Sequence, residues 1–153
     1  MRRRPLNLLD QPWIHAAAID RLQDPTPRLV WLHARGLAAP WDAPFAWREQ
    51  FRDEEDPESP AGVGPPEFAV TSQTDPDELL GWVHAYAGQV LALDESLGHF
   101  LEALNHANLS ATTQVTLVSP RGFALGEHLR VGKCDESLFN EVTQLVWLMR
   151  FPD

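Results

Sequence analysis

The sequence is poor in cysteine and in basic side chains, and both shortages exclude classes of function. Its single cysteine, Cys134, excludes an internal disulfide and any zinc site built from several cysteines. We therefore expect a reducing compartment and a cytoplasmic protein. Only 12 lysines and arginines stand against 22 acidic residues, which gives a formal net charge of −10. Nucleic acids and anionic membranes attract basic patches, so neither is expected as a partner.

Long apolar runs are also missing. No window approaches the ~20 apolar residues that a membrane span requires. The basic start at residues 1–4 is followed by prolines and polar residues, not by the apolar stretch of a signal peptide. The chain does contain 44% hydrophobic residues, with six tryptophans, which is enough for a proper core. We expect a soluble protein with one domain over residues 1–153.

Two segments have the apolar spacing of helices. Residues 14–22 predict a short helix that ends before a pair of prolines. Residues 77–104 predict a long helix, and Asp75 or Asp77 can cap its start. One apolar stripe should bury this helix, and its members repeat every three or four residues: Tyr86, Val90, Leu93, Leu97, Phe100 and Leu104.

Three short apolar runs predict strands, at residues 29–32, 115–118 and 145–149. Continuous apolar runs are typical of strands that are buried on both faces, as in a parallel sheet. The order is strand, long helical crossover, strand, loop and strand. This order predicts an α/β fold with a mainly parallel sheet flanked by helices.

Between residues 40 and 76 lies a long loop that is rich in proline and carries an acidic run at residues 53–56. A loop of this length without clear secondary structure is usually functional or mobile. We expect aromatic side chains to anchor its first part, namely Trp41, Phe45, Trp47 and Phe51. We expect the acidic run to be a solvated surface, with a cation site as the alternative.

Three segments and the tail match, in this order, the motifs of one enzyme family. Residues 29–33, running into 39–44, are similar to a strand and an Asp-Pro-His-x-Pro-Tyr loop. Residues 86–104 resemble a Tyr-Ala…Asp-x-x-Ile-Gly…Leu helix. Residues 115–133 are similar to a strand with a Ser-Asp-His-Gly, Gly-Glu-His and Gly-Lys series, and residues 136–152 fit a tyrosine–glutamate–glutamate stretch and the strand that follows. In these motifs and their order the chain resembles the sulfatase family of the alkaline-phosphatase superfamily.

The resemblance implies a truncated, degenerate sulfatase-like domain of the alkaline-phosphatase-like fold. The family's formylglycine segment and its tandem metal-binding aspartates lie upstream of the matched region. Cys134 does not fit that nucleophile, because the family's Cys-x-Pro-x-Arg pattern does not follow it. Pro120 and Arg121 stand where the Ser-Asp-His-Gly turn carries metal ligands. Proline offers no ligand atom and a guanidinium stays cationic, so no metal is expected there.

The family's Asp-Pro-His loop has also lost its polar residues, since Gly36 and Ala38 occupy the places of its aspartate and histidine. Attack on a sulfate ester needs a nucleophile and compensation of developing negative charge. We therefore expect no catalytic residue and no cofactor.

Four basic side chains are the candidates for an anion site: Lys133, His128, Arg121 and His33. Lys133 stands at the place of the family's sulfate-contacting lysine. Open α/β sheets bind ligands at the carboxyl ends of their strands, so the site is expected there. Ion pairing with the acidic loop is the alternative.

The resulting hypothesis is a non-catalytic interaction or regulatory module with a vestigial sulfate or anion site. The alternative is a sulfatase subunit that another chain completes. In either case we expect a protein partner, as a homodimer or a separate chain, because strands this apolar require covered faces and paired edges.

Two other groups of residues have the side chains that catalysis or metal binding requires. His99 and His106 flank Glu102 on the long helix, but they are seven residues apart, not the four of a zinc-protease helix. Ser119 and His128 could contribute to a Ser-His-Asp arrangement, yet no Gly-x-Ser-x-Gly turn surrounds the serine. We expect His99 and His106 to be solvated side chains on a helix face, and Ser119 to be an ordinary loop residue.

Overall fold

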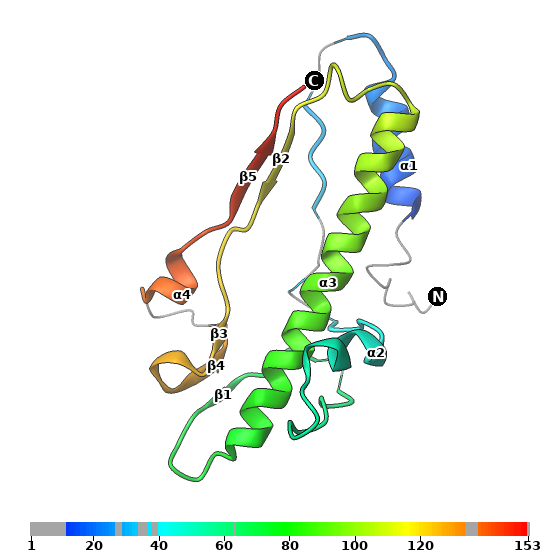
Figure 1. The fold of residues 1–153 in the computed structure, drawn as a ribbon. Coiled ribbons are helices and arrows are strands. Elements are labelled where there is room, and N and C mark those ends of the chain that lie inside the picture. The colour runs from blue at the N-terminus through cyan, green and yellow to red at the C-terminus, as the bar shows by residue number, and fades with distance from the viewer. Residues whose placement is uncertain are drawn as a thin grey trace, which may run out of the picture.

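The computed structural model describes residues 12–26, 29–33, 37, 40–62, 64–133 and 138–152. One helix, α3, runs along most of the molecule, and the other elements are arranged around it (Figure 1). The elements in chain order are α1 (Pro12–Leu22), α2 (Phe45–Arg48), the 3-10 helix η2 (Glu49–Phe51), β1 (Phe68–Ala69), α3 (Pro76–His106), β2 (Val115–Val118), β3 (Ala124–Leu125), the 3-10 helix η3 (Glu127–Leu129), β4 (Arg130–Gly132), α4 (Asn140–Thr143) and β5 (Trp147–Arg150).

Both predicted helices are confirmed. The side chain of Asp75 caps α3 by accepting a hydrogen bond of 3.0 Å from the backbone N–H of Asp77, and Pro76 occupies the first turn, where its missing N–H costs nothing. Helix α1 packs against the C-terminal half of α3. Their contact is an apolar core in which Ala18, Phe100 and Leu104 are buried.

The N-terminal half of α3 is buried through a different face from the one expected. Its buried residues are small or polar, and Val90 of the predicted stripe is 40% exposed. Small residues are required there because the chain after Trp41 crosses the helix closely. A Cβ atom on Gly88 would lie 2.9 Å from the Cα of Arg48, so glycine allows this approach.

The predicted truncated sulfatase-like α/β fold with a mainly parallel sheet is wrong. The described residues form two small antiparallel sheets, one of three strands in the order β1-β4-β3 and one of two strands, β2 and β5. Residues 29–32 form no strand, and Leu29 and Trp31 are 87% and 71% exposed. An apolar run has the same pattern in a buried parallel strand and in an exposed antiparallel one, so the runs alone could not decide the pairing.

The proline-rich segment is more ordered than expected, since it contains α2, η2 and β1. Trp41 anchors it, is fully buried, and packs against Trp82, Tyr86 and Phe123. Burial there raises the pKa of the Tyr86 hydroxyl. The predicted anchors Phe45 and Phe51, by contrast, are each about half exposed.

Arg48 anchors this segment more extensively than any aromatic residue does. Its guanidinium donates hydrogen bonds to four backbone carbonyl oxygens, those of Trp41 at 2.7 Å, Ala43 at 3.2 Å, Pro60 at 2.7 Å and Gly62 at 3.1 Å. Its side chain is only 4% exposed. Burial lowers the pKa of this guanidinium, and the nearby carboxylate of Asp42 partly offsets that effect. A buried cation thus organises residues 41–62 from within.

Candidate functional site

The ribbon formed by β2 and β5 exposes apolar side chains on the face turned away from α3. Side chains of a strand alternate between its faces, and Val115 packs into the α1–α3 core. The cross-strand pairs Thr116–Met149 and Val118–Trp147 therefore lie on the outer face. Trp147 and Met149 are 70% and 49% exposed. A two-stranded ribbon is at best marginally stable alone, so this face is poorly protected.

Both long edges of the ribbon present unpaired backbone groups. The N–H of Ser119 donates to the carbonyl oxygen of Val146 at 3.0 Å, which makes this a hydrogen-bonded pair. Hydrogen-bonded and non-hydrogen-bonded pairs alternate in antiparallel strands. Thr116 and Val118 thus direct their backbone N–H and C=O groups away from β5, and Trp147 and Met149 direct theirs away from β2. Among the residues that the structure describes, none hydrogen-bonds to these outward groups.

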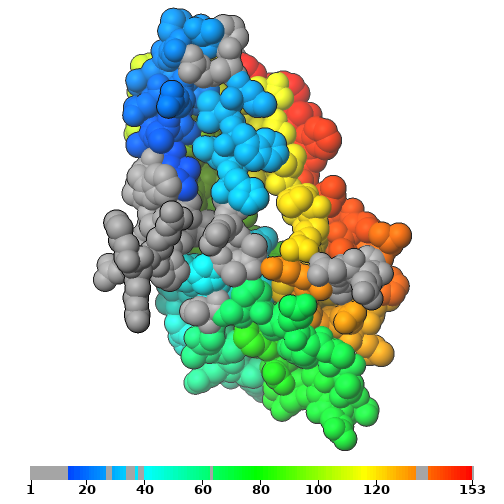
Figure 2. Space-filling model, turned by 180° about the vertical axis from the view of Figure 1, so that it is seen from behind, coloured from blue at the N-terminus to red at the C-terminus, as the bar shows by residue number. Residues whose placement is uncertain are grey.

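Residues 29–33 lie next to the ribbon as an extended segment. Val30 packs against the α1–α3 core, so the neighbouring side chains of Leu29 and Trp31 point away from that core. The outer face of the ribbon is also directed away from it. The segment runs in the same direction as β2 and lies on the side of β2 away from β5 (Figure 1). Viewed from behind, an opening passes through the molecule between the segment and β2 (Figure 2). Protein interiors are normally close-packed, so an open passage between two apolar segments is unusual.

We call the exposed apolar side chains on this side the outer apolar surface. It consists of Leu29, Trp31, Val118, Trp147 and Met149.

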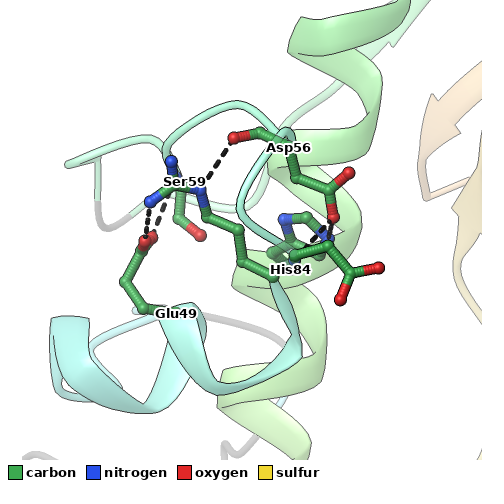
Figure 3. A network of polar contacts seen from close by, with 6 residues as sticks. Glu49, Asp56, Ser59 and His84 are labelled. Carbon is green, nitrogen blue, oxygen red and sulfur yellow. Dashed lines mark hydrogen bonds and ion pairs between the residues drawn. The ribbon is translucent and has the colours of Figure 1, made fainter.

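A network of polar contacts lies near the other end of the molecule and includes a serine, a histidine and an aspartate (Figure 3). His84 is 4% exposed, and its Nε2 lies 3.4 Å from Oδ2 of Asp56. Glu49 accepts hydrogen bonds from Arg52 at 2.8 Å and from the backbone N–H of Ser59 at 3.2 Å. These two bonds, that of Arg52 above all, lower the pKa of the Glu49 carboxyl.

This network ties the proline-rich segment to α3 and does not form a catalytic triad. Oγ of Ser59 and Nδ1 of His84 are buried and have no hydrogen-bond partner. The serine hydroxyl is therefore not activated by the histidine, as nucleophilic catalysis would require.

The predicted anion-binding residues come from different segments and differ in exposure. Nδ1 of His128 lies 2.6 Å from Oε1 of Glu141. Lys133 is half-buried after β4, and His33 is exposed at the end of residues 29–33. Arg121 is exposed in the turn that follows β2.

Glu141 contacts one ring nitrogen of His128, Nδ1, with its carboxylate. The imidazole of His128 also stacks on the ring of Phe139, with centroids 3.7 Å apart. Partial burial raises the pKa of the Glu141 carboxyl, but the hydrogen bonds from its own backbone N–H and from His128 outweigh this and lower it. The carboxylate therefore competes with any incoming anion, and the anion site stays a prediction from the sequence.

Neither a metal centre nor a membrane span is visible in the described part of the chain. No group of three or more histidine, cysteine, aspartate and glutamate side chains there could hold a metal ion. None of its helices combines the length and the apolar character needed to cross a bilayer. Cys134 lies outside the described residues, as do Gly36 and Ala38 of the sulfatase-like loop.

No protein-family model matches the chain, and no curated protein matches it either. The resemblance to the sulfatases therefore stays a prediction that depends on motif order alone.

Sequence reasoning missed the buried polar side chains that hold residues 41–62 against α3. Besides Arg48 and His84, these include Gln89, whose Oε1 accepts a hydrogen bond of 3.0 Å from the backbone N–H of Ala43. One signal could have indicated them. Gly81 and Gly88 stand two turns apart on a long helix, and glycine inside a helix usually has a packing reason.

Proposed function

We propose that this chain is a non-catalytic interaction module that binds another polypeptide through its outer apolar surface and the open edges of the β2–β5 ribbon. The observation that carries the proposal is the exposure of two tryptophans, Trp31 at 71% and Trp147 at 70%. Tryptophan is enriched in the energetically dominant parts of protein interfaces, because a large rigid ring buries much area at low entropic cost.

The size of the surface fits this function. A buried aromatic side chain covers ~150–250 Å², so each of these two tryptophans leaves about 100–170 Å² uncovered. With Leu29, Val118 and Met149 the exposed apolar area is on the order of 500 Å², shared between residues 29–31 and the ribbon, and exposed apolar area of this size is often functional. Covering it yields about 12 kcal/mol at ~25 cal/mol per Å², which is comparable to the ~4–15 kcal/mol cost of association.

The alternative, a sulfatase subunit that another chain completes, is less suitable because the described residues form no mainly parallel sheet. A sulfatase subunit completed by another chain would still contain Pro120 and Arg121 in the metal-binding turn. Neither side chain can coordinate a divalent cation, because proline has no ligand atom and arginine stays protonated. We therefore favour binding over hydrolysis even in a complex.

The test uses one exposed tryptophan and a matched control. The full chain, tagged and isolated from the cells that produce it, should be associated with a stoichiometric partner by native mass spectrometry. Trp147→Glu should abolish this association, whereas Phe45→Glu should preserve it, because Phe45 is 48% exposed but lies on α2. A monomer that is free of partners in the wild type, or equal binding by both variants, contradicts the proposal.

A further inference from the structure

We propose that the partner contributes an apolar β-strand that inserts between residues 29–33 and β2 and pairs with both. This inference deepens the proposed function and rests on it. It specifies how the partner binds, namely through backbone hydrogen bonds along one defined edge in addition to side-chain contacts on the outer face.

The free edge of β2 supplies the first half of the argument. Thr116 and Val118 direct their backbone N–H and C=O groups toward the side of β2 on which residues 29–33 lie. An edge strand with unpaired groups is a template for strand addition. Peptide recognition by β-augmentation uses this geometry, with main-chain bonds for affinity and alternate side chains for specificity.

The opening supplies the second half. The opening lies between two extended segments that run in the same direction. One face of each segment is directed at the α1–α3 core, because Val30 and Val115 both pack there. Neither segment hydrogen-bonds to the other across the opening among the described residues. One inserted strand would pair with both segments and would also fill the passage.

The chemistry of the occupant follows from its surroundings. Its inner face would contact the α1–α3 core, and its outer face would lie between Trp31 and Val118. Such a strand carries apolar side chains toward the core and beside Trp31 and Val118, and it contains no proline, because proline cannot pair within a sheet. Basic rather than acidic flanks would suit a chain with a net charge of −10.

A second copy of the chain is the less suitable occupant. In the described residues the apolar extended segments are residues 29–33, β2 and β5, and all three already border the opening or belong to the ribbon. A symmetric dimer can pair β5 with β5 along the far edge, but that pairing leaves the opening unfilled. The occupant we infer is therefore a strand of a different polypeptide.

The test distinguishes the two edges of the ribbon. Its probe is a short synthetic peptide of valine and isoleucine with lysines at both ends, added to the full chain. Amide hydrogen exchange should slow about tenfold or more at Thr116, Val118 and residues 29–33, and should stay unchanged at Trp147 and Met149. The same peptide N-methylated on alternate residues should lose this effect, because it lacks the donors for one edge.

Two proline variants provide the matched pair, since Thr116 and Met149 face each other across the ribbon and each directs its N–H outward. Thr116→Pro should weaken peptide binding about tenfold, as expected for a lost hydrogen bond of about 1.4 kcal/mol. Met149→Pro should leave peptide binding within about twofold of the wild type, because the peptide makes no hydrogen bond to the β5 edge. The loss of one hydrogen bond would weaken binding by more than that.

The contrary outcomes are distinct. If the peptide slows amide exchange at Trp147 and Met149, and if Met149→Pro weakens its binding, then the peptide pairs with the β5 edge and the insertion model is wrong. An absence of amide protection from the peptide overturns insertion. The proposed function survives either result if the natural partner is still lost in Trp147→Glu and retained in Phe45→Glu. The N-methylated peptide tests the unmodified protein, so the conclusion does not depend on whether Thr116→Pro folds.

Discussion

The packed segment around Arg48 and the exposed ribbon of β2 and β5 reverse the usual distribution of polar and apolar groups. The contact between residues 41–62 and α3 buries a guanidinium from the segment, and a histidine and a glutamine from the helix. The ribbon is rich in Leu, Val, Trp and Met, yet every residue of β5 except Arg150 is exposed. The difference shows that apolar content alone does not decide which part of this chain is self-sufficient. Arg48 supplies donors for four backbone carbonyls of the segment, whereas the apolar ribbon leaves its edges open among the described residues.

The largest expected effect is at Arg48. Arg48→Met should destabilise the protein by about 3 kcal/mol or more, because four backbone carbonyls lose their donor at once and a buried unsatisfied group costs ~1–3 kcal/mol. Urea unfolding would measure the change. The control is Arg52→Met, which removes a partly exposed ion pair and should cost no more than ~1 kcal/mol. Equal losses for the two variants would show that Arg48 is not the centre of this segment.

Close approach between the chain and α3 can be tested with two glycines of the same helix. Gly88→Ala should destabilise by about 1–3 kcal/mol, because the new methyl group would lie 2.9 Å from the backbone of Arg48. Gly98→Ala meets nothing within 4 Å and should instead stabilise by ~0.5–1 kcal/mol, since alanine favours the helix. Thermal unfolding of both variants decides the matter. A stabilised Gly88→Ala protein would mean that the segment can move away from the helix.

On the ribbon the expected effect on stability is small. Trp147→Thr should leave the free energy of unfolding of the isolated chain within about 0.5 kcal/mol, because the side chain is 70% exposed. It should nevertheless reduce the binding of a fluorescent hydrophobic dye to the folded protein. A loss of several kcal/mol would show that Trp147 packs within the chain and is not available to a partner.

The smallest effect concerns pH and the polar network. The pKa of Glu49 is lowered by its hydrogen bonds, first that from Arg52 and then that from the Ser59 backbone. A depressed pKa stabilises the fold above the ordinary value of 4.5, and this contribution is lost as the pH falls through 4.5 and then through the lower folded value. Glu49→Gln should therefore flatten the dependence of stability on pH in that range. An unchanged slope would assign the acid sensitivity to other carboxyls.

Local signals in the sequence were sufficient for the two long helices, α1 and α3, but not for the short helices α2 and α4. Asp75 and Pro76 determined where α3 begins, and its apolar residues at three- and four-residue spacing determined that it is a helix. The run at residues 115–118 also correctly predicted a strand. These features depend on residues that are close in sequence, within one or two helical turns, so they can be predicted from the sequence alone.

Pairing and burial could not be predicted in the same way. The runs at residues 29–32 and 145–149 resemble buried strands, but burial depends on what lies beside them, and the described residues supply only an antiparallel partner for β2. The role of Arg48 was equally inaccessible, because its acceptors are carbonyl oxygens placed by the path of the chain. The proposed anion residues and the expected partner stay predictions, and the exposed ribbon now indicates where a partner would bind.

The pattern of hydrogen bonds at Arg48 has a consequence for how freely the surrounding segment can vary. All four acceptors are main-chain oxygens, a group that every amino acid carries. Substitution of the acceptor residue Gly62 keeps its oxygen as long as the chain keeps its path, and a Cβ there meets only an ordinary contact 3.7 Å away. A saturation mutagenesis scan should therefore find position 48 nearly invariant beside a permissive Gly62. In this segment Arg48 fixes the path of the chain through main-chain oxygens, so an open acceptor position such as Gly62 is free to vary.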